Sequence, residues 1–425
     1  MKTLKLDNFR CFETFEMEFR TGLNLLIGDN SSGKTTVLKA LKIALSSFFM
    51  GFSDEYTRFI GIDKSDFTVS SHGDMMRLDR PVKISFRLMD SVFPGSDVLW
   101  LELHSKKSKT TQKGVKDYKA YAQQKFQLIV QGENQAPLPL FACFSTEDIH
   151  SSRKISEAKF KQYALPPSFG YYECLQGDGF FDYWIKRLLV LTEGKRSLNE
   201  VEIVRQAIIG ALGEDGCNII RDVSVRPQQG VVYFVLIDGR EVAAETLSDG
   251  YKRLVNIVMD LAFRCAILNG RIYGTEAYKE TCGTVLIDEI DEHLHPSLQT
   301  VVMACLHKAF PKLQFIITTH APMVMSSIET NEDNVVYKLN YDVQSGYTQT
   351  AVSTYGMDAS QIIEVFMHHA PRVKAVADEL EALFGAIDAE EVEKAQNMLA
   401  EMKQKYGQTI PELSQAAAML TFYES

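Results

Sequence analysis

Residues 28–41, GDNSSGKTTVLKAL, match the pattern G-x-x-x-x-G-K-[ST] at every defined position. They follow GLNLLIG, an apolar run that predicts a buried strand, and they lead into a helical run. The two glycines allow backbone N–H groups to wrap a triphosphate, Lys34 would reach its β and γ phosphates, and Thr35 would ligate Mg²⁺. An ordinary Gly/Ser turn is the alternative, but the flanking strand and helix favour a phosphate-binding loop. The predicted loop comprises Gly28, Asp29, Asn30, Ser31, Ser32, Gly33, Lys34, Thr35 and Thr36.

Two further apolar runs end in residues that suit nucleotide hydrolysis. TVLIDE, residues 284–289, is a buried-strand pattern that ends in Asp288, which would hold Mg²⁺, and Glu289, the candidate general base. QFIITTH ends at His320, whose imidazole would bond the γ-phosphate and position water. Such residues at a strand end are often structural in isolation. The intact phosphate-binding loop upstream favours catalytic roles for Glu289, His320 and Lys34.

The segment LSDGYKRL, residues 247–254, predicts a second phosphate-binding element. Ser248 precedes a long apolar run and is the predicted N-cap of a helix. The N-terminus of a helix attracts anions through its uncapped N–H groups and its dipole. We therefore expect Ser248, Asp249 and Gly250 to contact a phosphate.

The composition is that of a globular protein. The chain has 425 residues, 45% of them hydrophobic, so it can bury a large core or two lobes that share a sheet. No apolar stretch approaches the roughly 20 residues of a membrane span, and the N-terminus lacks the apolar core of a signal peptide. Seven scattered cysteines without C-x-x-C spacing argue against disulfides and zinc. We expect a soluble, cytoplasmic protein without a membrane partner, and its net charge of −10 disfavours nucleic-acid binding over the whole surface.

The motifs occur in the order of the Walker A, signature, Walker B and H-loop motifs of ABC-type ATPases, which this sequence resembles. In that superfamily the signature of one protomer closes over the nucleotide held by the Walker A motif of another. The resemblance therefore implies ATP and Mg²⁺ as cofactors and a homodimer with two composite sites. It also implies that Asp291, in the D-loop, lies at the dimer interface. Asp249 and Tyr251 depart from the common L-S-G-G-Q pattern, whereas Ser248 and Gly250 are kept.

The branch of this superfamily is indicated by the N-terminus and by missing features. LKLDNFRCFETFEMEF, residues 4–19, resembles the opening of SMC, RecF and OLD-type ATPases. The roughly 210 residues between the Walker A and signature motifs show no sustained heptads, which argues against a long coiled coil. About a hundred residues follow His320, too few for a TOPRIM nuclease and a connector.

The predicted fold class is α/β, an ABC-type P-loop ATPase head with a mixed central sheet, a β-rich subdomain, a helical lobe and a C-terminal helical tail. Four parts are expected: a nucleotide-binding lobe with the β-subdomain (1–150), a helical and irregular lobe (151–240), an ATPase lobe with the signature, Walker B, D-loop and H-loop motifs (241–345), and the helical tail (346–425). The tail would pack on the head or present a surface to a partner or another copy.

The segments DEIDEHLHP and GAIDAEEVEKAQNMLAEMKQKYG are similar to the PtuA-like ATPases of Septu and retron-linked antiphage defence systems. That resemblance implies an ATPase that regulates a separate HNH-type nuclease, similar to PtuB. Two other functions remain open. One is a RecF-like DNA repair or replication ATPase, and the other is a soluble ATPase subunit of a membrane complex.

Three weaker signals carry alternatives. A lysine-rich segment with Tyr118 and Tyr121 would bind nucleic acid or form a solvated hairpin, and the second is favoured. His293 and His295 would ligate a metal or simply lie in the D-loop region, which is strongly favoured. Asp66 is a Q-loop candidate or a turn residue. The lysines of the segment include Lys106, Lys107, Lys109, Lys113 and Lys116.

Overall fold

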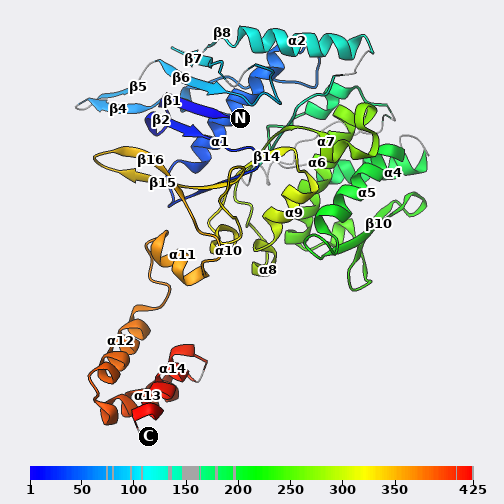
Figure 1. The fold of residues 1–425 in the computed structure, drawn as a ribbon. Coiled ribbons are helices and arrows are strands. Elements are labelled where there is room, and N and C mark those ends of the chain that lie inside the picture. Colours follow the sequence, from blue (N-terminus) through cyan, green and yellow to red (C-terminus); the bar gives the residue numbers. More distant parts are fainter. Residues whose placement is uncertain are drawn as a thin grey trace. The chain divides into compact units, whose positions relative to one another are not determined.

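The computed structural model divides the chain into two compact units, Met1–Ala359 and Ser360–Ser425 (Figure 1). The seven cysteines all lie in the described residues, and none of them forms a disulfide there. The structure describes residues 1–72, 75–78, 81–95, 98–106, 109–132, 136–145, 162, 164–177, 180–194, 198–407 and 409–423.

A six-stranded sheet forms the centre of the first unit, in the order β16-β15-β3-β14-β13-β9. The five strands from β15 to β9 run parallel, and β16 pairs antiparallel with β15. Every residue of β3, β13 and β14 is buried, as expected for parallel strands covered on both faces. The strands are β3 (Leu23–Ile27), β9 (Leu140–Phe144), β13 (Gly283–Ile287), β14 (Leu313–Thr318), β15 (Val335–Asp342) and β16 (Gly346–Val352).

The carboxyl ends of β3, β13 and β14 bring the predicted motifs to one edge of this sheet. The parallel register pairs Leu26 with Thr318 and Ile287 with Ile317, so the segments that follow these strands are neighbours. Helix α1 (Lys34–Ser46) starts from the loop after β3. The sheet register therefore assembles a site from segments almost 300 residues apart in sequence.

A five-stranded antiparallel sheet, in the order β2-β1-β6-β7-β8, forms the predicted β-rich part. Strands β1 and β2 pair antiparallel in this sheet. Strand β6 alternates buried and partly exposed residues, as is usual for a sheet with one covered face. Helix α2 (Lys116–Val130) follows β8. The strands are β1 (Thr3–Phe9), β2 (Phe12–Glu18), β6 (Val82–Arg87), β7 (Leu101–Ser105) and β8 (Thr110–Gly114), with β4 (Val69–His72) and β5 (Met75–Leu78) as a separate pair.

Helices predominate in the second half of the first unit. Helix α6 has 25 residues and is the longest in the described part of the chain, where no long coiled coil occurs. A buried polar contact attaches α4 to α6, because the indole of Trp184 donates to the carboxylate of Asp260. The same carboxylate accepts from the guanidinium of Arg264, one turn further along α6. The helices are α4 (Phe181–Glu193), α5 (Leu198–Leu212), α6 (Asp249–Tyr273), α7 (Ala277–Glu280), α8 (Pro296–Gln299), α9 (Val302–Ala309) and α10 (Pro322–Met325). A three-stranded sheet comprises β10 (Ile220–Arg226), β11 (Val231–Leu236) and β12 (Glu241–Ala243), the last two forming a hairpin.

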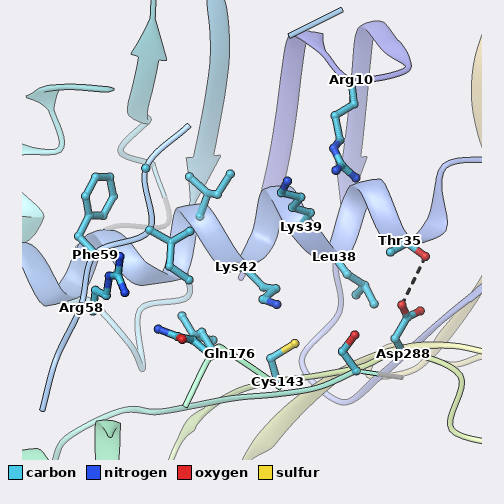
Figure 2. Close-up of a pocket in the computed structure, with 15 residues that line it drawn as sticks. Arg10, Thr35, Leu38, Lys39, Lys42, Arg58, Phe59, Cys143, Gln176 and Asp288 are labelled. Carbon is cyan, nitrogen blue, oxygen red and sulfur yellow. Dashed lines mark hydrogen bonds between the residues drawn. The ribbon is translucent and has the colours of Figure 1, made fainter. Parts of the chain in front are cut away.

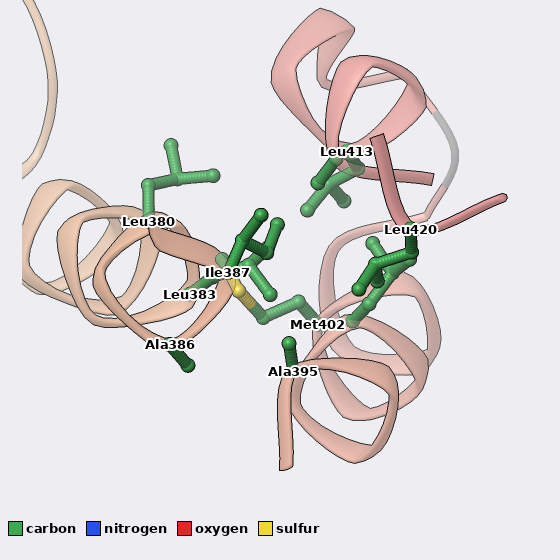
Figure 3. Close-up of a cluster of buried hydrophobic side chains, with 10 residues drawn as sticks. Leu380, Leu383, Ala386, Ile387, Ala395, Met402, Leu413 and Leu420 are labelled. Carbon is green, nitrogen blue, oxygen red and sulfur yellow. The ribbon is translucent and has the colours of Figure 1, made fainter. Parts of the chain in front are cut away.

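The second unit is helical, as predicted for the tail, and has a core of its own (Figure 3). Helix α11 (Ala359–Val365) begins at the boundary, and α12 (Lys374–Asp388), α13 (Val392–Tyr406) and α14 (Pro411–Tyr423) follow. Apolar residues spaced three or four apart on these helices meet in the core. They are Leu380, Leu383, Ala386, Ile387, Ala395, Leu399, Met402, Leu413, Ala416 and Leu420.

The predicted fold class is confirmed, including the mixed central sheet, the β-rich part and the helical tail. The predicted division into four parts stays a prediction. Its boundary at residue 345 passes between β15 and β16, which pair in one sheet.

Candidate nucleotide-binding and hydrolysis site

The predicted phosphate-binding loop adopts a backbone conformation that requires glycine at two positions. Gly28 has φ 143° and Gly33 has φ 96°, and Ser31 also has a positive φ of 71°. A Cβ atom on Gly28 would lie 2.3 Å from the carbonyl oxygen of Leu339, and one on Gly33 would lie 2.5 Å from the ring of Phe12. The loop is therefore tightly enclosed by β15 and β2, and a side chain at either glycine would displace it.

Two polar side chains in the loop suit an anionic ligand. The Lys34 ammonium donates to the carbonyl oxygens of Gly28 (2.8 Å) and Asp29 (2.9 Å). Burial lowers the pKa of Lys34, while the charges of Asp288, Asp29 and Glu289 oppose this shift. The buried hydroxyl of Ser32 has no hydrogen-bond partner among the described residues. A triphosphate in the loop would offer acceptors to both side chains, so the loop fits the predicted ligand.

Thr35 and Asp288 meet as the predicted metal ligands should (Figure 2). The Thr35 hydroxyl donates to the Asp288 carboxylate at 3.4 Å, and Asp288 is only 6% exposed. Its other carboxylate oxygen accepts from the Thr318 hydroxyl. Mg²⁺ prefers such oxygen ligands and is usually held by one or two protein groups together with substrate phosphates. The described residues contain no larger group of acidic, histidine or cysteine side chains that could hold a metal alone.

Glu289 follows directly in a left-handed backbone conformation, with φ 49°. Its backbone N–H donates to the Thr318 hydroxyl at 2.8 Å. Burial raises the pKa of Glu289, and the negative charges of Asp288, Asp291 and Glu292 raise it further. A raised pKa strengthens a carboxylate as a proton acceptor, which suits the predicted general base.

His320 lies at the end of the next strand and is linked to Asp291. Burial lowers the pKa of His320, and the charge of Lys34 acts in the same direction, so the neutral imidazole is favoured. The Thr319 hydroxyl donates to the Asp291 carboxylate, and the His320 backbone N–H lies 3.4 Å from the same oxygen. Asp291 therefore joins the loop after β13 to the turn after β14.

The predicted signature segment begins α6 as expected. Ser248 is the N-cap, but its side chain makes no capping hydrogen bond, and both Ser248 and Asp249 are exposed. Gly250 is buried, and a Cβ atom there would lie 2.5 Å from the carbonyl oxygen of His293. Glycine is thus required for close packing of α6 against the loop after β13. The three residues are not among the described residues that line the cavity at Thr35 and Asp288.

Arg253 is a site residue that sequence reasoning missed. It lies in the first turns of α6 and is 7% exposed. Its guanidinium donates to the carbonyl oxygens of Asp288 and Glu289, both at 3.0 Å, and to the carboxylate of Glu292 at 3.0 Å. The signature helix is therefore fixed to the backbone of Asp288, the predicted metal ligand, and of Glu289, the predicted base. A basic residue one turn after Gly250 was the only signal in the sequence.

A cavity of about 500 Å³ extends from Thr35 and Asp288 along α1. Figure 2 shows Arg10, Lys39, Lys42 and Arg58 among its lining residues, with Gln176 on another segment. Gln176 was also missed by sequence reasoning. Its amide oxygen is a possible ligand for a hard cation, and a glutamine before the turn residues GDG was its only signal.

Asp66, the Q-loop candidate, does not line this cavity. Its carboxylate is fully buried and forms ion pairs with Lys39 (2.6 Å) and Arg10 (3.2 Å). Asp66 therefore positions two cations that face the cavity, which favours a structural role.

Comparison with known proteins agrees with this geometry. A family model described as "AAA domain" matches residues 3–208, which include the phosphate-binding loop. A second AAA-domain model, whose description names the AbiEii toxin of type IV TA systems, matches residues 132–326, which include the signature segment, both acids and His320. Residues 3–326 are therefore similar to AAA-type ATPase domains. The predicted enzyme class, an ATPase, is thereby confirmed, and such domains bind ATP.

Several relatives of this ATPase have names that describe their systems. The Retron Vc95 probable ATPase of Vibrio cholerae serotype O1 biovar El Tor is 31% identical over 155 residues, which are 35% of this chain and 29% of that protein. The Retron Ec83 probable ATPase of Escherichia coli is 24% identical over 77% of this chain and 69% of that protein. The Septu protein PtuA of Bacillus thuringiensis is 23% identical over 78% of this chain and 74% of that protein. The predicted similarity to Septu and retron ATPases is confirmed.

The lysine segment of the ATPase lies on β8 and the start of α2. Lys106, Lys109, Lys113 and Lys116 are exposed, and Lys107 lies outside the described residues. Tyr118 is fully buried and packs on the rings of Phe48 (5.5 Å) and Phe93 (5.2 Å). This tyrosine therefore belongs to the core and is not available to stack on a base. Nucleic-acid binding by the lysines stays a prediction.

The two histidines after Asp288 have separate roles. His295 is the N-cap of α8, where its ring accepts from the Ser297 backbone N–H, and Pro296 is the first residue of the helix. His293 is exposed beside Glu292. These contacts support the favoured, non-metal interpretation.

Within the described residues, no helix has the length and apolar character needed to cross a membrane.

Replacement of Thr318 by valine tests the network around the two acids. Thr318→Val keeps the shape of the side chain but removes the hydroxyl that contacts Asp288 and Glu289. We expect turnover to fall about 10- to 100-fold, because a hydrogen bond to a charged group contributes about 1.5–3 kcal/mol. Nucleotide affinity should change less. Steady-state ATP hydrolysis and equilibrium nucleotide titration measure the two effects.

Thr284→Val is the matched control. Thr284 is buried at the opposite end of β13, where its hydroxyl contacts Gln314 at 3.0 Å. This variant should lose stability but retain turnover. Equal turnover in the two valine variants would contradict a role for the Thr318 hydroxyl in catalysis.

Proposed function

We propose that this ATPase hydrolyses Mg-ATP in composite sites of a homodimer and so regulates a separate effector, an HNH-type nuclease, in retron- or Septu-like antiphage defence. The observation that carries the hydrolytic part is the hydrogen-bonded set of Thr35, Asp288, Thr318 and Glu289. It places candidate metal ligands and a candidate base at the end of the phosphate-binding loop.

The residues have complementary tasks in the proposed reaction. Mg²⁺, held by Thr35 and Asp288, would neutralise charge on the β and γ phosphates. Lys34 would leave the loop carbonyls to contact the same phosphates. Glu289 would accept a proton from the attacking water, and the neutral imidazole of His320 would donate to the γ-phosphate. The opposite pKa shifts of Glu289 and His320 support this division.

The exposed start of α6 supports a composite site. Ser248 and Asp249 face solvent, the Ser248 hydroxyl makes no capping bond, and Gly250 and Arg253 hold the helix in place from behind. A rigid helix end with free N–H groups is suited to an anion supplied by another molecule. A second copy of the chain supplies that anion, as nucleotide in its own loop, in an isologous dimer.

The relatives and the second unit support an effector partner. Their names connect similar chains with retrons and with Septu PtuA. Residues 360–425 contain 11 Asp and Glu against 5 Lys and Arg, a net charge of −6, around a separate core. We propose this acidic unit as the docking surface for an effector with a basic face.

Two substitutions separate binding from hydrolysis. Lys34→Ala should lose nucleotide binding, because the only loop cation would be gone. Glu289→Gln should keep binding, lose about 100-fold or more of turnover and accumulate ATP-bound dimers, because the base contributes mainly to the chemical step. Nucleotide titration, phosphate release and size-exclusion chromatography with light scattering measure these effects. Normal turnover in Glu289→Gln would exclude Glu289 as the base.

A third substitution tests the composite site. Ser248→Arg should bind nucleotide but hydrolyse it slowly, since the new side chain would block the partner's nucleotide. Ser53→Arg, at an exposed serine outside the signature segment, is the control and should retain activity.

Mixing Ser248→Arg with Lys34→Ala makes this test sharper. Each heterodimer would contain one intact site, so turnover should recover to about a quarter of the wild-type value after random exchange. Two inactive variants that stay inactive when mixed, despite forming heterodimers, would count against shared sites.

The proposed effector partner is tested with the Glu289→Gln variant, which is expressed together with its native neighbouring genes. The lysate is treated with nuclease, the variant is purified in the presence of ATP, and the proteins that co-purify are identified by mass spectrometry. A stoichiometric nuclease that is absent from Lys34→Ala preparations is the expected result. An ATPase that purifies alone and binds duplex DNA with steep salt dependence would instead support the RecF-like alternative. Recovery of the ATPase together with membrane proteins would support the remaining alternative, a soluble ATPase subunit of a membrane complex.

A further inference from the structure

The cavity beside Thr35 and Asp288 continues along α1, past the predicted position of the nucleotide phosphates. A triphosphate held by the loop would lie at the N-terminus of α1, next to Thr35. The cavity reaches Ile43, which is about 12 Å further along the helix axis. Its far end therefore lies beyond the predicted phosphate site. The residues of α1 that line it share one face of the helix and are Thr35, Leu38, Lys39, Lys42 and Ile43.

Positive charge predominates in this cavity. Among the described residues, four cations and one carboxylate, that of Asp288, line it. Mg²⁺ in the predicted metal site would compensate the charge of Asp288 and leave the four cations in excess. A cleft lined by one sign of charge attracts ligands of the opposite sign. The cations are Arg10, Lys39, Lys42 and Arg58.

Two of these cations are held in place by a carboxylate outside the cavity. The buried carboxylate of Asp66 forms ion pairs with Lys39 at 2.6 Å and with Arg10 at 3.2 Å. One negative charge compensates only part of the charge of two cations. Arg10 and Lys39 therefore have defined positions and still contribute net positive charge to the cavity.

The other two cations, Lys42 and Arg58, lie near Gln176, at the end of the cavity away from Thr35 (Figure 2). In the part of the chain that the structure describes, neither side chain forms an ion pair or a hydrogen bond. An arginine fork binds phosphate through two parallel hydrogen bonds, and a lysine adds a point charge. This end of the cavity thus offers two cations to an anionic ligand.

The segment that carries Arg58 is fixed on both sides. The carboxylate of Asp54 accepts from the backbone N–H groups of Tyr56 and Thr57, both at 3.1 Å. The backbone N–H of Ile60 donates to the hydroxyl of Ser46, the last residue of α1, at 3.0 Å. The backbone at Arg58 is therefore held against the same helix that carries Lys42.

Apolar side chains form much of the remaining wall. Leu38, Ile43 and Leu175 are buried, and Phe59 is partly buried. The volume of about 500 Å³ is in the range of sites for small organic ligands. Cations beside an apolar wall suit a ligand that has both phosphate groups and an organic part.

We propose that this cavity binds a second ligand, a small phosphorylated organic molecule, in addition to the nucleotide in the loop. Lys42 and Arg58 contact its phosphate groups, and Arg10 and Lys39 add positive charge. This inference goes beyond the proposed function, because it adds a ligand and holds whether or not the nucleotide in the loop is hydrolysed.

Calorimetric titration of the full chain with inorganic pyrophosphate tests the second site. Pyrophosphate also suits the phosphate-binding loop, so the titration is made in Lys34→Ala, where the loop has lost its cation. Binding should persist there, and adding Lys42→Gln or Arg58→Gln should weaken it about 10- to 100-fold, because each change removes a charge-assisted hydrogen bond. Arg271→Gln, at an exposed arginine of α6, is the matched control and should leave pyrophosphate binding unchanged.

A second measurement keeps the test independent of the Lys34→Ala background. In Glu289→Gln saturated with Mg-ATP the loop is occupied, and pyrophosphate should still bind with the same dependence on Lys42 and Arg58. In the single variants Lys42→Gln and Arg58→Gln, ATP affinity should fall much less than pyrophosphate affinity. Melting temperatures of all variants show whether they fold.

Three results would overturn the proposal. Absence of pyrophosphate binding in both folded backgrounds would leave the loop as the anion site of this region. Equal weakening of ATP and pyrophosphate by Lys42→Gln and Arg58→Gln would assign these cations to the nucleotide in the loop. A single-stranded oligonucleotide that binds through Lys42 and Arg58, when pyrophosphate does not bind, would show that the cavity takes a nucleic acid and not a small ligand.

Discussion

The hydroxyl of Thr318 is the contact on which the proposed hydrolytic site depends. It donates to the carboxylate of Asp288 and accepts from the backbone N–H of Glu289, so one side chain at the end of β14 fixes both acids after β13. This arrangement requires the parallel register that places the two strand ends side by side. Arg253 holds the same two residues from the other side through their carbonyl oxygens. The acids are thus positioned by neighbouring elements as well as by their own loop.

The sequence allowed the central parts of this site to be predicted because they are local. The loop from Gly28 to Thr36 contains its own turn residues, lysine and hydroxyls, and buried strands such as TVLI are recognisable from their apolar runs. Strand order was not predictable in the same way, since β9 and β15 join the sheet through long-range pairing. The separation of the second unit likewise follows from a core that only the packed helices reveal.

The residues that were missed act across elements. In the sequence Arg253 is one of several arginines in a predicted helix, and its role follows only from the packing of α6 against the loop after β13. Gln176 likewise becomes a site residue only because it lines the cavity that Thr35 and Asp288 also line. Tyr118 shows the reverse case. Its place among lysines suggested a surface, but it is fully buried and packs on Phe48 and Phe93, which belong to two other segments. A sequence pattern thus indicates what chemistry a residue can perform, whereas its neighbours in the folded chain determine whether the residue is placed to perform it.

The close packing of Gly250 on His293 has a mechanical consequence. Arg253 donates to the backbone carbonyls of Asp288 and Glu289, so the first turns of the 25-residue helix α6 and the acidic loop are joined by direct contacts. A force applied at the exposed start of α6 would reach the backbone of Glu289, the proposed base, through these contacts. In the proposed dimer, closure and alignment of this carboxylate would therefore be a single motion, and a partly closed dimer would hold its nucleotide without hydrolysing it.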